Sequence, residues 1–591
     1  MATLTPAGKA ALFLVVAGGA FGAWRVMQQR GTPGGTGGET TVSGTASGTG
    51  SGTGTSLPAG DSCKAGTPVR FLGYAWNAHM GLHYANGGVS SAADSFMCKR
   101  GVNLTYGRQD MNDKLTEALV AFATALERGE KNPTAGAHFV TVMGDGSAAF
   151  LKGLDDALQK IGPAYRPKVV ATIGYSRGED KFMGPAAWKA DPKLAKGSVI
   201  AGVIRDGDWN IALKWAQDNG LRSNPDEKTY DPDALNWVNT SDYLDAGEKY
   251  ITGYSEFRPV VRNGKPTGER KKVAVQGVVT WTPGDVNVAQ KKGGLVSIVS
   301  TKEYASQMPC TVIGIDKWCK DNRQTVENML QAIYEGGAAV MKSDAALQEG
   351  AQISATVYKE QDAAYWARYF KGVVEKDKTG LSVELGGSSA NTLSDAARTF
   401  GLIPGKANSF AEVYQQFGDI VVSQYPKVVP EYPPVEQVLD TSYVNDLVKK
   451  VGLPTILSTP KATPRPPSMP PSKPQQISGR AYDIPFATGR AEFQSNASKV
   501  LNSLKRDVLV ASNTNIEIHG HTDNVGDPAK NMQLSEARAF AVKTWLEKQA
   551  PVDFSGRIKV YSHGQTQPAK PNTTEAGRAA NRRVEVKLIT R

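Results

Sequence analysis

Two short motifs near the C-terminus contain the residue types best suited to binding a charged small molecule. GHTDNVG, at 520–526, carries Asp523, and NMQLSEARA, at 531–539, carries Arg538. A carboxylate can accept hydrogen bonds from an ammonium group, and a planar guanidinium can hold a carboxylate through two parallel hydrogen bonds. Taken alone, an aspartate in a turn is usually a capping residue and a helical arginine is usually solvated. Whether Asp523 and Arg538 form a binding site therefore depends on the elements that position them.

The sequence around these motifs predicts a small α/β module. Ile516–Gly520 alternates in polarity as a strand does, and the loop that follows is punctuated by glycine and asparagine. A helix is expected to open at Leu534, because apolar residues then recur at helical spacing. Another strand is expected near Ile558–Tyr561, and 577–586 is typical of a helix end that runs into a last strand. Helices packed on a small sheet are the expected architecture.

Residues 477–591 resemble the OmpA-like peptidoglycan-binding family. GHTDNVG, NMQLSEARA and the NRRVEV stretch that begins at Asn581 occur in the family's order and at its spacing. The resemblance implies a non-catalytic module that grips the cell wall. It also implies that Asp523 and Arg538 hold the ammonium and the carboxylate of diaminopimelate in the wall peptide. Thr522 and Asn531 are included in this expected site, and Asn531 is expected to shape the loop or to add a hydrogen bond.

Other polar residues of this module are expected to be structural. Arg582 and Arg583 should divide into one buried and one exposed arginine. His519 and His521 share one face of the predicted strand. Two histidines without a third ligand are usually structural, so no metal and no other cofactor is expected.

The composition excludes some classes of function. At 591 residues the chain is too long for a single core. Its net charge of +11 comes from Lys and Arg mixed with Asp and Glu, without a long basic block, so no nucleic-acid partner is expected. No GxSxG, HExxH, Walker or dinucleotide-binding motif is placed after a predicted strand, so no enzymatic activity is expected.

The first 30 residues predict a destination in the cell envelope. Residues 10–24 form an apolar run without charges, flanked by Lys9 and Arg25. An uncleaved inner-membrane anchor is favoured, because both flanking side chains can reach the headgroups and so lengthen the span. A cleaved signal peptide is the alternative, although 20–22 is a poor cleavage site. With either outcome the remainder of the chain is expected in the periplasm.

Two linkers divide the exported part. Residues 31–60 are almost wholly Gly, Thr and Ser, which is typical of a flexible coil. Residues 454–476 are rich in proline, which favours a stiffer polyproline II spacer. The expected order is therefore an anchor at 1–30, a flexible linker, a large domain at 61–453, a stiff linker and the wall-binding module at 477–591.

All the cysteines lie between the two linkers, at Cys63, Cys98, Cys310 and Cys319. An even number of cysteines in an exported region indicates two disulfides, for which three pairings are possible. Local pairing is favoured, joining Cys63 to Cys98 and Cys310 to Cys319.

The domain at 61–453 alternates short β-rich runs with helical patterns, which predicts parallel sheets with crossover helices in two lobes. The β-rich runs are 69–74, 139–143, 169–173, 198–204 and 275–281. This order of elements resembles type 2 periplasmic solute-binding proteins, which deliver substrates to ABC transporters, and it is most similar to the nitrate, taurine and phosphate binders. The whole chain is thus expected to combine this two-lobed α/β fold, a small C-terminal α/β sandwich and an N-terminal membrane helix.

Ligands of such folds sit between the lobes, at the carboxyl ends of strands and against helix N-termini. The loops expected there supply the candidate solute-binding residues Trp76, Asn77, Ser176, Arg177, Asp208, Trp209, Asn210 and Thr282. Ser176 and Arg177 would suit an anion, and a helix at 211–218 could present backbone N–H groups to one. Asp206 and Asp208 argue against a purely anionic pocket.

These patterns together predict a membrane-anchored envelope protein that binds peptidoglycan through residues 477–591. Its domain at 61–453 is expected to bind a small solute, with an anion as one candidate. The alternative is a purely structural tether that has no solute ligand.

Overall fold

The computed structural model of the chain describes residues 62–453, 474–549, 554 and 556–591. The expected membrane segment at 1–30, the linker at 31–60 and most of the linker at 454–476 lie outside the described residues. Among the helices in the described ranges, none has the length and hydrophobicity that a membrane span requires.

The first lobe of the middle region is built on a sheet with the strand order β15-β4-β12-β3-β1-β2. The strands are β1 (Thr67–Gly73), β2 (Val102–Arg108), β3 (Phe139–Met143), β4 (Pro167–Ser176), β12 (Pro309–Ile315) and β15 (Ser388–Ala390). β3 and β12 are buried along their whole lengths. Helices that cover both faces of a sheet account for such uninterrupted apolar strands.

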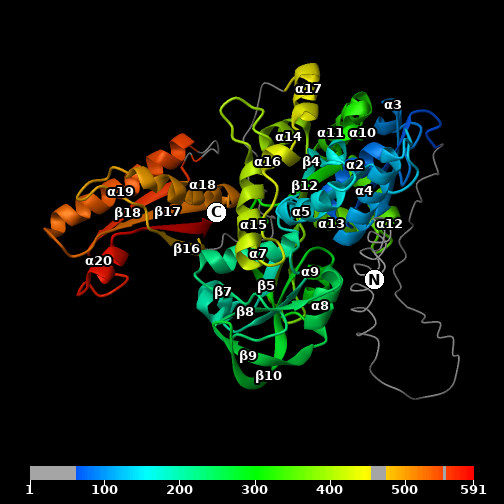
Figure 1. Cartoon of the computed structure of the whole chain (residues 1–591). Helices are drawn as coiled ribbons and strands as arrows, with labels where there is room; N and C mark the ends of the chain where they lie inside the picture. The colour runs from blue at the N-terminus through cyan, green and yellow to red at the C-terminus, as the bar shows by residue number, and fades with distance from the viewer. Residues whose placement is uncertain (1–61, 454–473, 550–553, 555) are drawn as a thin grey trace, which may run out of the picture. The chain divides into compact units, whose positions relative to one another are not determined.

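The second lobe has its own sheet, with the order β11-β5-β10-β6-β8-β7 and with β9 paired to β10. The strands are β5 (Lys181–Gly184), β6 (Val199–Gly202), β7 (Arg222–Ser223), β8 (Ala234–Asn239), β9 (Ser255–Arg262), β10 (Lys265–Thr280) and β11 (Val296–Ser300). Figure 1 shows this sheet in green. The predicted runs at 69–74, 139–143, 169–173, 198–204 and 275–281 correspond to β1, β3, β4, β6 and the end of β10.

The expected parallel pairing is present in both sheets, but antiparallel strands join each of them. β1 runs parallel to β2 and β3, but β12 runs antiparallel to β3 and β4. In the second sheet β5 is antiparallel to both β10 and β11. The reason is the path of the chain, which leaves the first sheet at the carboxyl end of β4 and re-enters it beside that same end as β12. A strand that begins beside the end of its neighbour must run in the opposite direction.

Helices and a short hairpin complete the middle region. In chain order they are η1 (Asn77–His79), α2 (Met80–Asn86), α3 (Phe96–Lys99), α4 (Asn112–Glu127), α5 (Ser147–Leu158), η2 (Pro163–Tyr165), α6 (Ala187–Ala190), η3 (Pro192–Ala195), α7 (Gly207–Asp218), α8 (Tyr243–Ile251), α9 (Gly284–Lys291), α10 (Asp316–Asp321), α11 (Arg323–Lys342), α12 (Asp344–Tyr358), α13 (Ala363–Lys371), β13 (Val373–Lys376), β14 (Ser382–Leu385), α14 (Leu393–Thr399), α15 (Ser409–Gln424), α16 (Val435–Val438) and α17 (Ser442–Val451).

Two short crossings, 177–180 and 301–308, connect the lobes and lie side by side. The Thr301 N–H donates to the carbonyl of Asp180 at 3.1 Å. The hydroxyls of Ser176 and Thr301 lie 2.6 Å apart, and the Gly178 N–H donates to the Thr301 hydroxyl at 2.8 Å. Paired crossings of this kind form a hinge of only a few residues between the two lobes.

One of the two expected disulfides is present. Cys63 and Cys98 are bonded and tie the segment before β1 to α3, which confirms that pairing. Cys310 and Cys319 are buried free thiols, so the second expected disulfide is wrong. Cys310 lies near the start of β12, whereas Cys319 lies in α10, beyond the end of that strand. A strand advances about 3.3 Å per residue, which keeps the two thiols apart.

The C-terminal module is an α/β sandwich with the strand order β16-β19-β17-β18. Its elements are β16 (Gln476–Tyr482), η4 (Ser495–Ala497), α18 (Ser498–Val510), β17 (Thr514–His521), α19 (Pro528–Gln549), β18 (Ile558–Gly564), α20 (Glu575–Asn581) and β19 (Val584–Thr590). Figure 1 shows α18 and α19 along one face of this sheet.

The main helix of the module begins earlier than the sequence pattern predicts. α19 starts at Pro528 rather than at Leu534. The Asp527 carboxylate accepts a hydrogen bond from the Lys530 N–H at 2.9 Å and so caps the helix. Proline in the first helical position has its backbone angle already set and needs no N–H partner. The cap and the proline thus extend the helix into a stretch without apolar periodicity.

Candidate functional site

The two motifs of the C-terminal module meet because a strand and a helix approach closely. A Cβ atom on Gly520 would lie only 2.0 Å from the Ser535 carbonyl oxygen, so only glycine fits at the end of β17. The Ser535 hydroxyl accepts a hydrogen bond from the Gly564 N–H at 3.0 Å. These contacts hold α19 against the ends of β17 and β18. The loop with Asp523 and the helical turn with Arg538 are positioned by the same contacts.

Thr522 and Asn531 organise the loop that carries Asp523. The Thr522 N–H donates to the carbonyl of Gly564 at 2.8 Å. The Asn531 side chain donates to the carbonyls of Asp523 and Val525 at 3.3 and 3.1 Å, and to the side-chain oxygen of Gln565 at 2.9 Å. Asn531 therefore fixes the backbone of the loop.

The Asp523 carboxylate is already engaged with an arginine. One carboxylate oxygen accepts a hydrogen bond from the Val525 N–H at 3.0 Å, and the other accepts one from Arg582 at 2.7 Å. Arg582 also bonds Glu575 at 2.7 Å, and these two hydrogen bonds raise its pKa. Because a carboxylate has about four acceptor positions, Asp523 retains capacity for an incoming ammonium group.

Arg538 is almost buried, with only 6% of its surface exposed. Its Nε donates to the carbonyl of Arg490 at 3.1 Å, and its guanidinium lies over the Phe486 ring, 5.1 Å from the centroid. Burial and the charge of Arg582 lower the pKa of Arg538, whereas the charge of Asp523 opposes that shift. No hydrogen bond within the described part of the chain uses its two terminal nitrogens. Arg538 can therefore offer a fork of donors to a carboxylate near Asp523.

Sequence reasoning missed two participants of this module. It did not place Arg582 on Asp523, because the two residues are joined only by the fold. It also missed His563, which β18 brings beside the histidine pair on β17. Nδ1 of His519 lies 2.8 Å from Nε2 of His563, and the His521 and His563 rings stack at 4.8 Å. Burial lowers the pKa of His521 to about 4.

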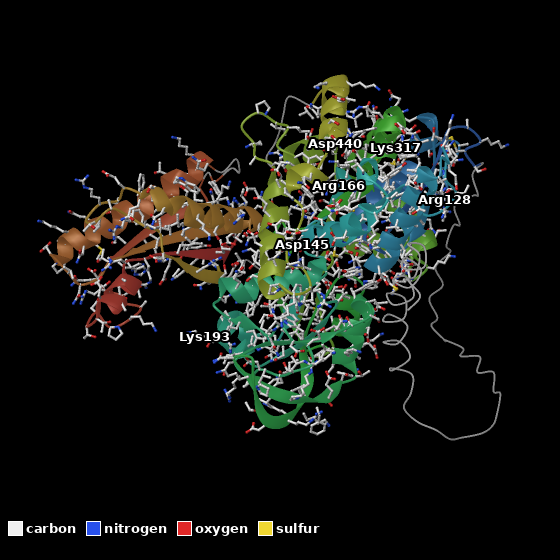
Figure 2. The ribbon with its side chains drawn as sticks, in the orientation of Figure 1. Arg128, Asp145, Arg166, Lys193, Lys317 and Asp440 are labelled. Carbon is white, nitrogen blue, oxygen red and sulfur yellow. A yellow bond between two sulfur atoms is a disulfide. The ribbon has the colours of Figure 1, made fainter. Side chains whose placement is uncertain are left out.

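The boundary between the two lobes gathers buried acids. Asp145 follows β3, Glu179 and Asp180 lie in the first crossing, and Asp206 and Asp208 lie at the start of α7; each side chain is at most 5% exposed. Asp145 lies in the interior of the ribbon in Figure 2. Burial raises the pKa of Asp180 to about 7 and the pKa values of Asp145, Asp208 and Glu179 well above their usual range.

Several predicted solute-binding residues join this acidic cluster. The Trp76 indole N–H donates to Asp180 at 3.2 Å, and the Asn77 amide donates to Glu179 at 3.3 Å. The Asn210 amide donates to the carbonyl of Asp145 at 3.0 Å.

Other predicted residues have different partners. Ser176 lies in the hinge, where its hydroxyl accepts a hydrogen bond from the Asp180 N–H at 3.0 Å. Arg177 lies over the Tyr175 ring and donates to the carbonyl of Ala305 and to the hydroxyl of Ser389. Trp209 packs in a buried aromatic cluster against Trp237 and Tyr425.

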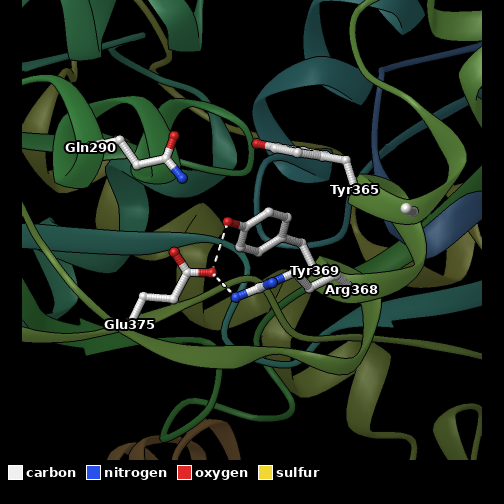
Figure 3. Close-up of a pocket in the computed structure, with 6 residues that line it drawn as sticks. Gln290, Tyr365, Arg368, Tyr369 and Glu375 are labelled. Carbon is white, nitrogen blue, oxygen red and sulfur yellow. Dashed lines mark hydrogen bonds and ion pairs between the residues drawn. The ribbon is translucent and has the colours of Figure 1, made fainter. Parts of the chain in front are cut away.

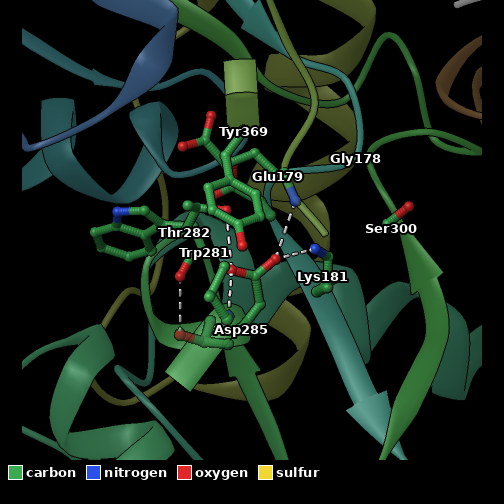
Figure 4. Close-up of polar contacts among 12 residues, drawn as sticks. Gly178, Glu179, Lys181, Trp281, Thr282, Asp285, Ser300 and Tyr369 are labelled. Atoms are coloured by element: carbon green, nitrogen blue, oxygen red, sulfur yellow. Dashed lines mark hydrogen bonds and ion pairs between the residues drawn. The ribbon is translucent and has the colours of Figure 1, made fainter. Parts of the chain in front are cut away.

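Thr282 belongs to a neighbouring ion pair. Lys181 and Asp285 form a salt bridge in which both side chains are fully buried. The Thr282 hydroxyl donates to Asp285 at 2.9 Å, and the Gly386 N–H donates to it at 3.1 Å. Figure 4 shows these contacts converging on Asp285. The ammonium group of Lys181 is therefore already neutralised by Asp285.

A hollow of about 320 Å³ opens between α9 and α13, lined by Gln290, Ala364, Tyr365, Arg368, Tyr369 and Glu375. Figure 3 shows Arg368 and Tyr369 both bonded to Glu375, at 2.6 and 3.0 Å. The buried hydroxyl of Tyr365 has no partner among the described residues. Burial raises the pKa of Tyr365, and the charges of Asp285 and Glu179 raise it further. Tyr365 is thus a buried residue that lines this hollow.

Comparisons with known proteins agree with the geometry of the C-terminal module. Residues 485–582 match the OmpA family. Over 106 residues the chain is 36% identical to outer membrane porin F of Pseudomonas fluorescens, which covers 18% of this chain and 32% of the porin. It is 31% identical over 109 residues to the outer-membrane lipoprotein YfiB of Pseudomonas aeruginosa, covering 18% of this chain and 63% of the lipoprotein. The match thus spans about a third of the porin's length and less than two thirds of the lipoprotein's.

Among solved structures, the periplasmic nitrate-binding protein NrtA from Synechocystis PCC 6803 aligns with 68% of this chain and 92% of its own, at 10% identity and a TM-score of 0.46. The OmpA family match covers the strands, the loop and the helix of the C-terminal module that carry Asp523 and Arg538. The C-terminal module, at residues 485–582, is therefore an OmpA-family domain.

Proposed function

We propose that this chain is a cell-envelope protein that binds peptidoglycan without covalent attachment and holds a small solute between its two lobes. The wall-binding half of the proposal is carried by the fork of donors that Arg538 offers beside the carboxylate of Asp523. Diaminopimelate ends in an ammonium beside a carboxylate, and the two side chains match those charges one for one. Thr522 and Asn531 keep the loop in the receptive shape.

Arg582 has a place in this mechanism. Without a wall peptide it neutralises Asp523, which prevents an unpaired acid from lying at the site. Its side chain is 39% exposed and has Glu575 as a second partner, so it can shift when an ammonium group arrives. The ammonium group of the ligand then neutralises the Asp523 carboxylate in part, in place of Arg582.

Sedimentation with purified peptidoglycan tests the wall-binding half. Asp523→Ala and Arg538→Ala should each weaken binding at least tenfold, because each leaves one charge of the ligand without a partner. Lys543→Ala, in the same helix but paired with Glu547, is the matched control and should pellet as the parent does. If both site variants still pellet fully while folded, the site lies elsewhere.

The solute-binding half rests on the two-lobed architecture with polar residues buried at the hinge. A pocket between lobes that close around a ligand is a common arrangement for small-molecule binding. No catalysis is proposed. A purely structural tether is the competing function, and it predicts that no small molecule stabilises the middle region.

The N-terminal anchor remains a prediction. The proposal places residues 1–30 in the inner membrane and the rest of the chain in the periplasm. Fractionation of cells producing the full chain, compared with cells in which a cleavable leader replaces residues 1–30, tests it. The full chain should sediment with inner membranes after the wall is digested, whereas the variant should become soluble.

A further inference from the structure

The buried acids between the lobes lack cationic partners. Asp145, Glu179, Asp180 and Asp208 form no salt bridge with any residue of the described ranges. Their side-chain donors are neutral groups, such as Gln307 on Asp145 and Trp76 on Asp180. Carboxylates buried without a counter-charge are strongly unfavourable unless they are protonated or meet a positive charge.

A second observation, independent of charge, concerns hydrogen bonds. Buried oxygens in this region accept no hydrogen bond from the described residues; they belong to Asn77, Asp145, Asp180, Asp208, Asn210 and Gln307. The amides of Asn210 and Gln307 turn their nitrogens toward Asp145 and leave their oxygens without donors. Native interiors rarely leave such groups unpaired. A group of unsatisfied acceptors calls for a ligand that brings several N–H donors.

Both lobes contribute to this group of acceptors. Asp145 and Gln307 belong to the first lobe and its crossing, whereas Asp208 and Asn210 belong to α7 of the second lobe. A Cβ atom on Gly207 would lie 2.6 Å from the Asp145 carboxylate, so the start of α7 touches that acid directly. A ligand held there would contact both lobes and favour their closure.

An anion is disfavoured at this place. The helix expected at 211–218 begins earlier, as α7 at Gly207. Its first N–H groups bond the chain's own acids: Asp206 accepts from Gly207 at 2.8 Å and Asp208 accepts from Trp209 at 2.9 Å. Arg177 is held in the hinge and Lys181 is paired with Asp285. An anion would therefore meet several carboxylates at this place.

A metal ion is disfavoured for a different reason. A metal requires its ligands to converge on one point at short distances. In the described part of the chain, no group of three or more His, Cys, Asp or Glu side chains has that arrangement. The acceptors are instead spread along the lobe boundary, where the indole N–H of Trp76 bonds Asp180. Spread acceptors beside an aromatic ring suit an extended organic cation.

We propose that the solute is a small organic cation with two or more ammonium groups, a di- or polyamine, held by Asp145, Asp180 and Asp208 with the amide oxygens of Asn77, Asn210 and Gln307. This inference rests on the proposed solute-binding function and names its substrate class.

Thermal unfolding of the full chain in 0.15 M salt, followed by calorimetric titration, tests the class. The probes are putrescine and spermidine; magnesium, calcium and zinc; and nitrate, phosphate and sulfate. The amines should raise the unfolding temperature and bind with one-to-one stoichiometry. A response to a metal or an anion without one to the amines would overturn the substrate class while solute binding stands. No response to any probe would overturn both.

Variants locate the site. Asp180→Asn with Asp208→Asn should weaken amine binding at least tenfold, because two charge-assisted contacts are lost. Asn210→Leu removes an acceptor without changing charge and should weaken binding by a smaller factor. Asp233→Asn is the control, since Asp233 is a half-buried acid of the second lobe that pairs with Lys196 and Arg262. Each variant's own unfolding temperature reports its folding, and equal amine affinity in all of them would contradict the site.

Discussion

Asp180 shows how a single side chain can be unfavourable for stability and useful for binding. It is fully buried, it accepts a hydrogen bond from Trp76, and its second oxygen has no donor among the described residues. Its pKa is raised to about 7 chiefly by desolvation. Asp180 therefore favours folding when it is protonated and disfavours folding once it ionises. A cationic ligand would reverse that preference.

This gives a prediction for Asp180→Asn. A carboxyl whose pKa is higher in the folded than in the unfolded state makes its full contribution below the unfolded pKa, near 4, and loses it as the pH rises to about 7. The variant should therefore gain stability relative to the parent between pH 5 and pH 8, by on the order of 2 kcal/mol. Chemical denaturation at both pH values checks this prediction, with Asp233→Asn as the control, because that acid is paired with Lys196 and Arg262. A constant difference between variant and parent would show that Asp180 is not perturbed in this way.

The sequence identified some residues of both candidate sites but not their partners. Trp76, Asn77 and Asn210 were predicted for the lobe boundary because each follows a strand or opens a helix, and all three contact the acids. Asp145 could have been found by the same signal, since it follows the strand at 139–143. Arg177 is predicted for an anion by its residue type, and in the structure it bonds the carbonyl of Ala305 and the hydroxyl of Ser389. Partners distant in sequence, such as Arg582 for Asp523, require the fold.

At the scale of elements, the close approach of β17 and α19 positions the wall-binding residues. Gly520 lies where a side chain would meet the backbone of Ser535, so we expect Gly520→Ala to destabilise the module by about 2–3 kcal/mol through overpacking. Peptidoglycan sedimentation should weaken in parallel. Gly153→Ala is the control: a methyl group there meets nothing within 4 Å, and α5 should gain about 0.5–1 kcal/mol. Equal effects of the two substitutions would refute the packing argument.

The disulfide between Cys63 and Cys98 is a second element-scale device. It closes a loop of 35 residues around β1, α2 and α3. Replacing both cysteines by serine should lower the stability of the first lobe by about 3–4 kcal/mol, the loop-closure value for this length. Cys310→Ser is the comparison, since it removes a buried thiol and no covalent bond. A reductant should lower the stability of the parent as much as the double substitution does, and it should not change the stability of the double variant. A parent whose stability is insensitive to reductant would contradict the assigned role.

Element types were predictable where apolar runs were long, as at β3 and β4, because burial on both faces leaves a continuous signal. The direction of a strand was not predictable, because it depends on which end of the neighbouring strand the chain re-enters beside. The start of α19 was set by a polar cap that carries no apolar periodicity. The predicted disulfide between Cys310 and Cys319 was wrong for a related reason. The two cysteines are close in sequence, but an extended strand separates them in space.

At the scale of the whole middle region, the acids couple the lobes to pH. Asp145 comes from the first lobe and Asp208 from the second, and burial raises the pKa of both. The closed form thus binds more protons than an open form in which these acids meet water. By linkage, closure without a ligand is favoured at low pH and is lost as the pH rises. An amine bridging the two acids would restore closure at high pH.

Spin labels can measure that coupling. Arg128→Cys and Lys193→Cys place exposed labels on the first and second lobes (Figure 2), while the native free thiols are buried. The distance distribution between labels should widen in the empty protein on going from pH 5.5 to pH 8, because like charges then face each other across the lobe boundary. Spermidine at pH 8 should narrow it again. In Asp145→Asn with Asp208→Asn the distribution should stay narrow at both pH values and respond little to spermidine. If the parent behaves as this double variant does, the acids do not govern closure. The proposal that their charge controls the lobe boundary would then be wrong.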